Sequence, residues 1–144
     1  MICQFKDDYY FMSNFYSFKL IYNGIEYQNT EAAFQAQKCK YLPERNQFSK
    51  LNPSEAKRLG RRVELRPDWE QVKDGIMYNI VLTKFSSDEY LAYKLLKTGE
   101  EVLMEGNTWK DTYWGVDLDT MEGKNKLGLI LMKVRDVLRA KIDY

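Results

Sequence analysis

The chain has 144 residues, of which 44% are hydrophobic and 15% aromatic, so it holds enough apolar side chains for a substantial core. Its formal net charge of +1 excludes binding to nucleic acid through a general basic surface. It contains no histidine, which excludes Ser-His-Asp and Cys-His nucleophiles and leaves proton transfer to Asp, Glu, Lys, Tyr or water.

The cysteines and the N-terminal residues indicate the compartment. Cys3 and Cys39 lie far apart without the spacing of zinc ligands, and such sparse cysteine is typical of a reducing environment. The first residues include no apolar signal segment, and no apolar run reaches the length of a membrane span. We therefore expect one globular domain over residues 1–144, located in the cytoplasm.

A β-hairpin is predicted near the N-terminus. Residues 18–22 and 25–28 read as strands joined by Asn23-Gly24, the dipeptide preferred in a type I′ turn. Before it, residues 12–15 resemble a turn that holds a polar pair between apolar anchors. The hairpin leads directly into the next segment.

Residues 27–40 predict a short helix with Asn29 or Thr30 as its N-cap. At 100° per residue, one face of this helix carries four side chains: Glu31, Phe34, Gln35 and Lys38. Glu31 lies in the first turn, where the helix dipole favours a carboxylate. Taken alone, this pattern is also typical of an ordinary helix start and a solvated lysine.

Further helices follow along the chain. One is opened by a capping box, with Asn52 as N-cap and Glu55 closing the box, and ends at Gly60. Another runs from Trp69 to about Lys84, with Asp68 as its cap. The arginines between them, at positions 61, 62 and 66, are either solvated or form a phosphate site. Two more helices contain residues 90–96 and 127–138.

Between the last two helices lies a short apolar run, residues 102–104, and then a polar loop over residues 107–117. The loop contains Trp109, Asp111 and Trp114, which form either a site wall or anchors of the loop on the core. With about five helices and one hairpin, the fold class is mainly α (α+β).

The motifs resemble, in order and over nearly the whole chain, those of the YbiA/NADAR family of N-glycosidases. The matching residues are Met12–Phe15, Gly24, Tyr27, Glu31, Phe34, Gln35, Lys38, Gly60-Arg61, Asp68-Trp69, Met77, Lys84-Phe85, Thr98-Gly99, Leu103, Glu105, Asp111, Trp114-Gly115, Gly123, Asn125, Leu127-Gly128, Leu131-Met132 and Arg135. The resemblance implies a single helical domain with a small N-terminal β-hairpin.

The resemblance also implies an activity, the hydrolysis of ribosyl N-glycosidic bonds without a metal or another cofactor. Two substrates would fit: ADP-ribose attached to guanine, in a nucleotide or in nucleic acid, and the phosphoribosylamino-pyrimidine intermediates of riboflavin biosynthesis. The partner would be such a small nucleotide or ADP-ribosyl molecule and not a membrane. The residues do not choose between the substrates and do not indicate an oligomeric state.

Cleavage of a C–N glycosidic bond places positive charge on the sugar, which a carboxylate stabilises. The candidate carboxylates are Glu31 and Asp111. The candidates for stacking on a planar base are Phe15, Trp69 and Trp114. The candidates for binding hydroxyl and phosphate groups are Asn14, Arg61, Lys84 and Asn125. Gln35, from the helix face, and Gly115, from the loop motif, complete the predicted substrate-binding set.

Lys38 has two interpretations. It acts as a nucleophile that forms a Schiff base with the opened ribosyl C1 while Glu31 handles the protons, or it holds a phosphate or pairs with a carboxylate. The residues leave both open, and the resemblance favours the nucleophile. The alternative function is a binding module that recognises an ADP-ribose-like or nucleotide ligand without cleaving it; a weaker one is a purely structural or interaction protein.

Overall fold

The computed structural model describes residues 1–142, which form five α-helices, two 3-10 helices and two two-stranded sheets. The mainly α (α+β) class with an N-terminal hairpin is confirmed. The chain divides into two compact units, Asn14–Ser87 and a second unit made of Met1–Ser13 with the segment from Asp88 onward. The expectation of one domain over 1–144 stays a prediction.

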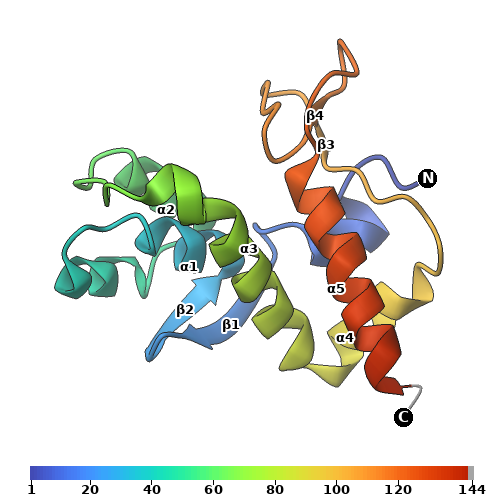
Figure 1. Cartoon of the computed structure of the whole chain (residues 1–144), viewed down its shortest axis with the longest axis horizontal. Coiled ribbons are helices and arrows are strands. Elements are labelled where there is room, and N and C mark those ends of the chain that lie inside the picture. The colour runs from blue at the N-terminus through green and yellow to red at the C-terminus, as the bar shows by residue number, and fades with distance from the viewer. Residues whose placement is uncertain (143–144) are drawn as a thin grey trace. The chain divides into compact units, whose positions relative to one another are not determined.

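The Asn14–Ser87 unit begins with the predicted hairpin (Figure 1). Strands β1 (Ser17–Tyr22) and β2 (Ile25–Asn29) pair antiparallel, and the pairing is irregular between Ser17 and Leu20. Asn23 and Gly24 have φ of 49° and 82°, the left-handed values that a type I′ turn requires of both central residues. The turn therefore forms where the Asn-Gly dipeptide predicts it.

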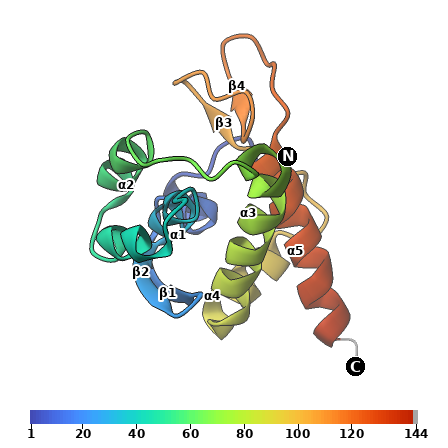
Figure 2. The same ribbon diagram turned by 60° about the vertical axis from the view of Figure 1, so that its left-hand side comes forward.

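Helix α1 (Thr30–Ala36) follows β2 at once, and all seven of its residues are buried. Asn29 is the N-cap, because its side chain accepts a hydrogen bond from the Ala32 backbone N–H at 2.7 Å. The helix contacts β2 and α2 (Figure 2). It is shorter than predicted: Lys38 lies beyond its end, and its backbone N–H bonds three residues back, to the Gln35 carbonyl. Lys38 is therefore not placed by a continuous helix face.

The 3-10 helix η2 (Leu42–Phe48) precedes α2 (Pro53–Gly60). The predicted capping box of α2 is present: Asn52 accepts from the Glu55 backbone at 2.8 Å, and the Glu55 carboxylate accepts from the Asn52 backbone at 2.9 Å. Helix α3 (Trp69–Ser86) also begins as predicted, with Asp68 at the N-cap position, but the Asp68 side chain makes no cap hydrogen bond. Its carboxylate accepts from the Arg66 guanidinium instead, at 2.6 and 3.0 Å.

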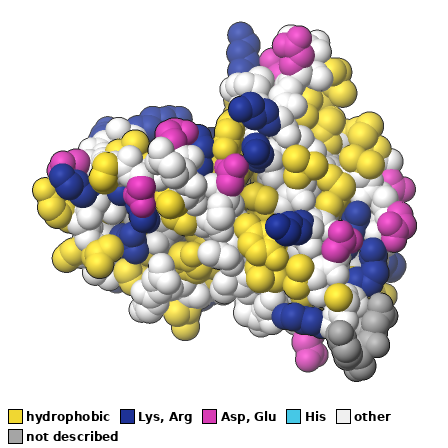
Figure 3. Space-filling model, in the orientation of Figure 1, with side chains coloured by type: hydrophobic (Ala, Val, Ile, Leu, Met, Phe, Trp, Pro, Cys, Tyr) yellow, Lys and Arg dark blue, Asp and Glu magenta, His cyan; other side chains and the backbone are white. Residues whose placement is uncertain are grey.

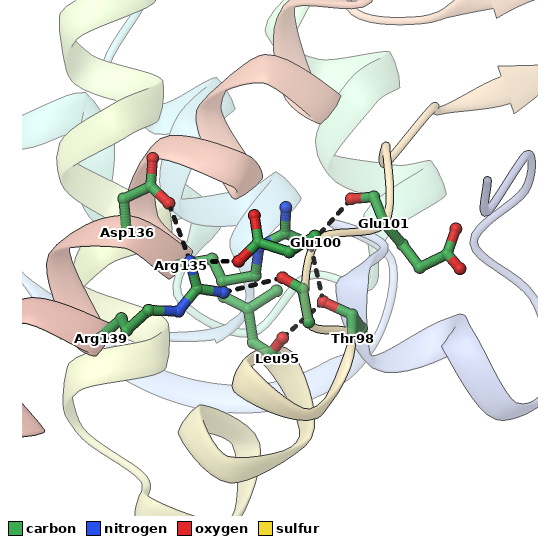
Figure 4. A network of polar contacts seen from close by, with 8 residues as sticks. Leu95, Thr98, Glu100, Glu101, Arg135, Asp136 and Arg139 are labelled. Carbon is green, nitrogen blue, oxygen red and sulfur yellow. Dashed lines mark hydrogen bonds and ion pairs between the residues drawn. The ribbon is translucent and has the colours of Figure 1, made fainter.

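The second unit contains the 3-10 helix η1 (Asp7–Met12) and the packed pair α4 (Glu89–Lys97) and α5 (Lys126–Ile142). Buried Arg135 on α5 donates to Thr98 Oγ1 and to the Glu101 carbonyl, each at 2.9 Å (Figure 4). Arg139, one turn later, donates to the Gly99 carbonyl at 2.8 Å. The two arginines thus hold the turn that follows α4.

The segment between α4 and α5 carries short strands, β3 (Gly106–Asn107) and β4 (Val116–Asp117), which pair in parallel and which the sequence did not predict. The run 102–104 contributes only an isolated bridge, between Leu103 and Ile2.

Cys39 is 1% exposed and lies in a backbone bridge with Leu65, and burial raises the pKa of its thiol. Cys3 is half-buried and also carries a free thiol. Among the helices of residues 1–142, none combines the length and the apolar character that crossing a membrane would demand.

Candidate active site

The candidate site is built around a buried carboxylate on α1. Glu31 is 7% exposed, and its Oε1 accepts a hydrogen bond of 2.9 Å from Gln35 Nε2, one turn further along the helix. The Glu31 backbone N–H donates to the Asn14 carbonyl at 3.1 Å, which ties the start of the helix to the segment before the hairpin. The Glu31 carboxylate therefore has a fixed neighbour within its own unit.

Lys38 lies in the turn after α1 and is half-buried. Burial lowers the pKa of its ammonium group; Glu31 acts in the opposite direction, and the cations Arg61, Lys57 and Lys73 lower it further. The carboxylate that the sequence placed on one helix face with Lys38 thus acts on the charge of this amine, although Lys38 is outside the helix. A lowered pKa increases the fraction of neutral amine.

Three further cations surround this amine. Lys57 and Arg61 come from α2 and the residue after it, one helical turn apart, and Lys73 comes from α3, where it pairs with Glu70 at 2.6 Å. Basic side chains gather along the upper edge of the Asn14–Ser87 unit, over α2 (Figure 3). Only Arg61 was predicted; the Lys57–Arg61 spacing, which puts both on one helix face, is the signal that could have revealed Lys57.

Two predicted stacking residues lie beside these cations. The Phe15 ring is 5.6 Å from Lys57 Nζ, and the Trp69 ring centroid is 6.0 Å from Lys38 Nζ. Trp69 is only 6% exposed and its ring packs at 5.1 Å from that of Phe34. Phe15 is half-buried, so its ring is the more accessible of the two.

Asn14 and Lys84 are both buried, at 8% and 1% exposure. Asn14 Nδ2 contacts Met77 Sδ at 3.5 Å. Lys84 Nζ lies 5.3 Å from the Tyr16 ring centroid, and desolvation lowers its pKa to about 7. A ligand would reach Lys84 only after movement of the side chains that cover it, so its substrate-binding role stays a prediction.

The other predicted residues belong to the second unit. There Asp111 Oδ1 accepts from the backbone N–H groups of Tyr113 and Trp114, at 3.0 and 2.9 Å, and the Asn107 side chain bonds both backbone groups of Asp111. The Asp111 carboxylate therefore shapes its own loop. Its catalytic role stays a prediction.

Trp114, Gly115 and Asn125 shape the same loop. The Trp114 ring meets that of Tyr113 edge-on at 4.9 Å. A Cβ at Gly115 would overlap Glu105, so the loop backbone requires glycine there. Asn125 accepts from the Glu105 N–H at 2.9 Å and donates to the Leu103 carbonyl at 3.0 Å. Both ends of the Asn125 amide thus bond the backbone, and the ligand contacts predicted for these three residues stay predictions.

Within the Asn14–Ser87 unit, the structure brings together Glu31, Gln35, Lys38 and Arg61 with the rings of Phe15 and Trp69. An acid, a partly desolvated amine, added cations and aromatic rings suit a sugar phosphate attached to a planar base. In residues 1–142 no three Asp, Glu, Cys or His side chains are grouped in a way that could hold a metal ion.

A family model and similar curated proteins point to the same family. The family model described as the NADAR domain matches residues 3–139. The N-glycosidase YbiA of Escherichia coli is 38% identical over 138 residues, covering 92% of this chain and 84% of that protein. A riboflavin biosynthesis protein of Vibrio vulnificus is 34% identical over 137 residues, covering 93% of this chain and 37% of that longer protein.

A solved structure gives the same result. The NMR structure of E. coli YbiA matches this structure with a TM-score of 0.85 and 32% sequence identity, covering 98% of this chain and 88% of that one.

Proposed function

This chain belongs to the NADAR family, and from that premise we propose that it is an N-glycosidase that hydrolyses the bond between a ribosyl C1 and the nitrogen of a planar base. Its substrate carries a phosphate on the sugar side and is either ADP-ribosylated guanine or a phosphoribosylamino-pyrimidine. The names of its relatives, N-glycosidase and riboflavin biosynthesis protein, support this class.

The observation that carries the proposal is the environment of Lys38. An amine attacks carbon only when it is neutral, and burial together with neighbouring cations lowers the Lys38 pKa and so favours that form. Glu31, buried and bonded to Gln35, supplies the carboxylate that such a reaction needs for its protons. The two groups perform complementary tasks within one unit.

The reaction begins with opening of the ribose. When the base is attached through an amino nitrogen, the C1–O4′ bond breaks and a proton passes from that nitrogen to O4′, carried by Glu31, which leaves a C1=N imine. Lys38 Nζ then adds to C1, and the C1–N bond to the base breaks. The base nitrogen receives both protons of the neutral Lys38 amine, one when Nζ adds and one when the C1–N bond breaks, so the base leaves as its free amine and C1 remains bound to Lys38 as an imine. Water next adds to the Lys38 imine and expels Nζ, so that one water is consumed overall.

Binding uses the groups around this pair. Lys57, Arg61 and Lys73 place positive charge where an anionic sugar phosphate would be attracted. The Phe15 ring is accessible enough to stack on the base. The same groups would serve a binding module equally well, so turnover is the feature that separates an enzyme from that alternative.

The test is an assay of both substrates with borohydride trapping. During turnover, borohydride should reduce the Lys38 imine and leave a sugar adduct that peptide mass spectrometry locates at position 38. Lys38→Arg keeps the charge but cannot form the imine, so we expect turnover to fall by about 10²-fold or more, in the range of an essential acid–base or nucleophilic group. Lys40→Arg, at an exposed lysine paired with Glu64, is the matched control.

Two outcomes would contradict the proposal in different ways. Near-normal turnover of Lys38→Arg would leave direct attack by water, with a carboxylate as the base. Binding of both substrates without release of base from either would identify a binding module instead.

A further inference from the structure

The Gln35 side chain lies between two structural features, the Glu31 carboxylate and the backbone of Gly60. Its Nε2 donates to Glu31 Oε1 at 2.9 Å. Its other amide atom, Oε1, faces the last residue of α2, where a Cβ on Gly60 would overlap Oε1 and would come within 2.9 Å of Cδ. Gln35 Nε2 thus contacts Glu31 on one side of the amide, while Oε1 packs against Gly60 on the other side, where only glycine leaves room for it.

The amide is held at a cost. Gln35 is 6% exposed, and within residues 1–142 its Oε1 is a buried acceptor for which no hydrogen-bond donor is found. An apolar side chain of similar size would fill this space without burying a polar oxygen. Rotating the amide would instead turn Oε1 toward the Glu31 carboxylate and exchange an attraction for a repulsion. The bond to Glu31 is the interaction that compensates for the buried oxygen.

Gly60 restricts the position of this amide. A methyl group at position 60 would occupy the space of Gln35 Oε1, so the Gln35 side chain would have to move away from α2 and its Nε2 would shift relative to Glu31. Because interiors are close-packed, such a shift is transmitted along the side chain. The orientation of Glu31 thereby depends on two helices, α1 and α2.

We propose that Gln35 is a positioning residue, which holds the Glu31 carboxylate in the orientation needed for reaction, and that Gly60 is what keeps Gln35 in place. This reassigns Gln35 from contact with the substrate to an action through Glu31. The inference rests on the proposed glycosidase function, since it assigns a partner to the carboxylate of that same site.

The kinetic test separates positioning from binding. Gln35→Met retains the volume but removes the donor, so we expect kcat to fall about tenfold to a hundredfold while KM changes little. Gly60→Ala should lower kcat in the same direction. Gly75→Ala is the matched control, because a Cβ at Gly75 on α3 meets no atom within 4 Å, and it should leave kcat unchanged.

Double variants test whether the three residues act as one unit. Gly60→Ala should cause no further loss of kcat in a Gln35→Met background, and Gln35→Met should cause little further loss in a Glu31→Gln background. Independent, multiplicative losses would overturn the proposal, as would a Gln35→Met variant whose change lies in KM alone.

A readout without turnover keeps the inference distinct from the proposed function. In the NMR spectrum, the Gln35 side-chain N–H resonances should move in Gly60→Ala and in Glu31→Gln, and stay in place in Gly75→Ala. If the wild type cleaves neither substrate but these resonances move, the glycosidase function fails while the Glu31–Gln35–Gly60 arrangement stands. Unmoved resonances in both variants would refute the arrangement whether or not the protein is an enzyme.

Discussion

Each of the two compact units buries charged side chains, and the partners of these charges differ. In the unit formed by residues 1–13 and 88–142, Arg135 bonds a hydroxyl and a carbonyl of the adjacent turn (Figure 4). In the Asn14–Ser87 unit, Glu31 is held by another side chain, and Lys38 lies among further cations. A charge matched by nearby neutral acceptors stabilises a turn, whereas like charges gathered around one amine destabilise the free protein, and an anionic ligand would relieve that repulsion when it binds.

The largest effect on kcat is expected for Glu31, whose carboxylate is the candidate acid–base group. Glu31→Gln keeps the shape and an acceptor for Gln35, so the melting temperature should stay within a few degrees of wild type. The loss of the carboxylate should reduce kcat by about 10²–10⁴-fold, the range for a general acid–base group. Melting curves and initial rates measure both. A large fall in melting temperature with unchanged kcat would make Glu31 a structural residue like Arg135.

Buried Lys84 should make the stability of the protein depend on pH. Its pKa is about 7 in the folded protein and near 10.5 in the unfolded chain, so between these values the unfolded chain binds more protons. The free energy of unfolding should therefore rise as pH increases from 7 to 10, with a limit of about 1.4 kcal/mol for each pKa unit. Chemical denaturation across this range measures the slope, which should be smaller in Lys84→Met. Equal slopes would show that Lys84 stays charged when folded.

Arg135 is expected to contribute to stability and not to the reaction. Arg135→Met removes two part-buried hydrogen bonds from a charged donor, so we expect the free energy of unfolding to fall by about 2–4 kcal/mol. The kcat of the folded fraction should not change. Urea denaturation and rates at low temperature check both, with Lys133→Met, an exposed position on α5, as the control. If the variant kept its stability but lost activity, Arg135 would be needed for the reaction and not for folding.

The smallest effect concerns two aspartates at helix starts, one in each unit. Asp88 accepts a hydrogen bond of 2.9 Å from the Leu91 N–H and caps α4, so Asp88→Ala should cost about 1 kcal/mol. Asp68 makes no cap bond and is paired with Arg66 at the surface, where solvent screens the pair, so Asp68→Ala should destabilise the protein less than Asp88→Ala does. Thermal unfolding of the two variants side by side measures the difference. Equal losses would mean that the cap bond contributes nothing.

Local chemistry made much of the fold predictable. The Asn23-Gly24 turn and the Asn52–Glu55 box specify their structures within a few residues, because the required φ values and cap bonds depend on those residues alone. The end of α1 was misplaced because no glycine or proline marks it. Instead, the backbone N–H of Lys38 bonds Gln35 rather than residue 34.

The candidate site was predictable in composition and not in detail. Glu31 and Lys38 were found from their spacing, and the bond between Glu31 and Gln35 follows the four-residue spacing of neighbours on one helix face. The arrival of Lys73 from α3, in contrast, depends on packing between helices. Asp68 resembled a helix cap because of its position, and a competing guanidinium two residues earlier took its carboxylate. Neither the spacing nor the composition of the chain reveals such competition.

Buried Cys39 follows Lys38 directly, and this neighbourhood makes its thiol a reporter of local opening. In the native structure, its 1% exposure and raised pKa leave it almost unreactive toward alkylating reagents, while half-buried Cys3 is more accessible. The slow alkylation of Cys39 in the native protein therefore measures how often the turn that carries Lys38 becomes accessible to solvent. A ligand that holds this turn in place would slow the alkylation of Cys39. The rate of that alkylation would therefore report how ligand binding affects the turn that carries the candidate nucleophile.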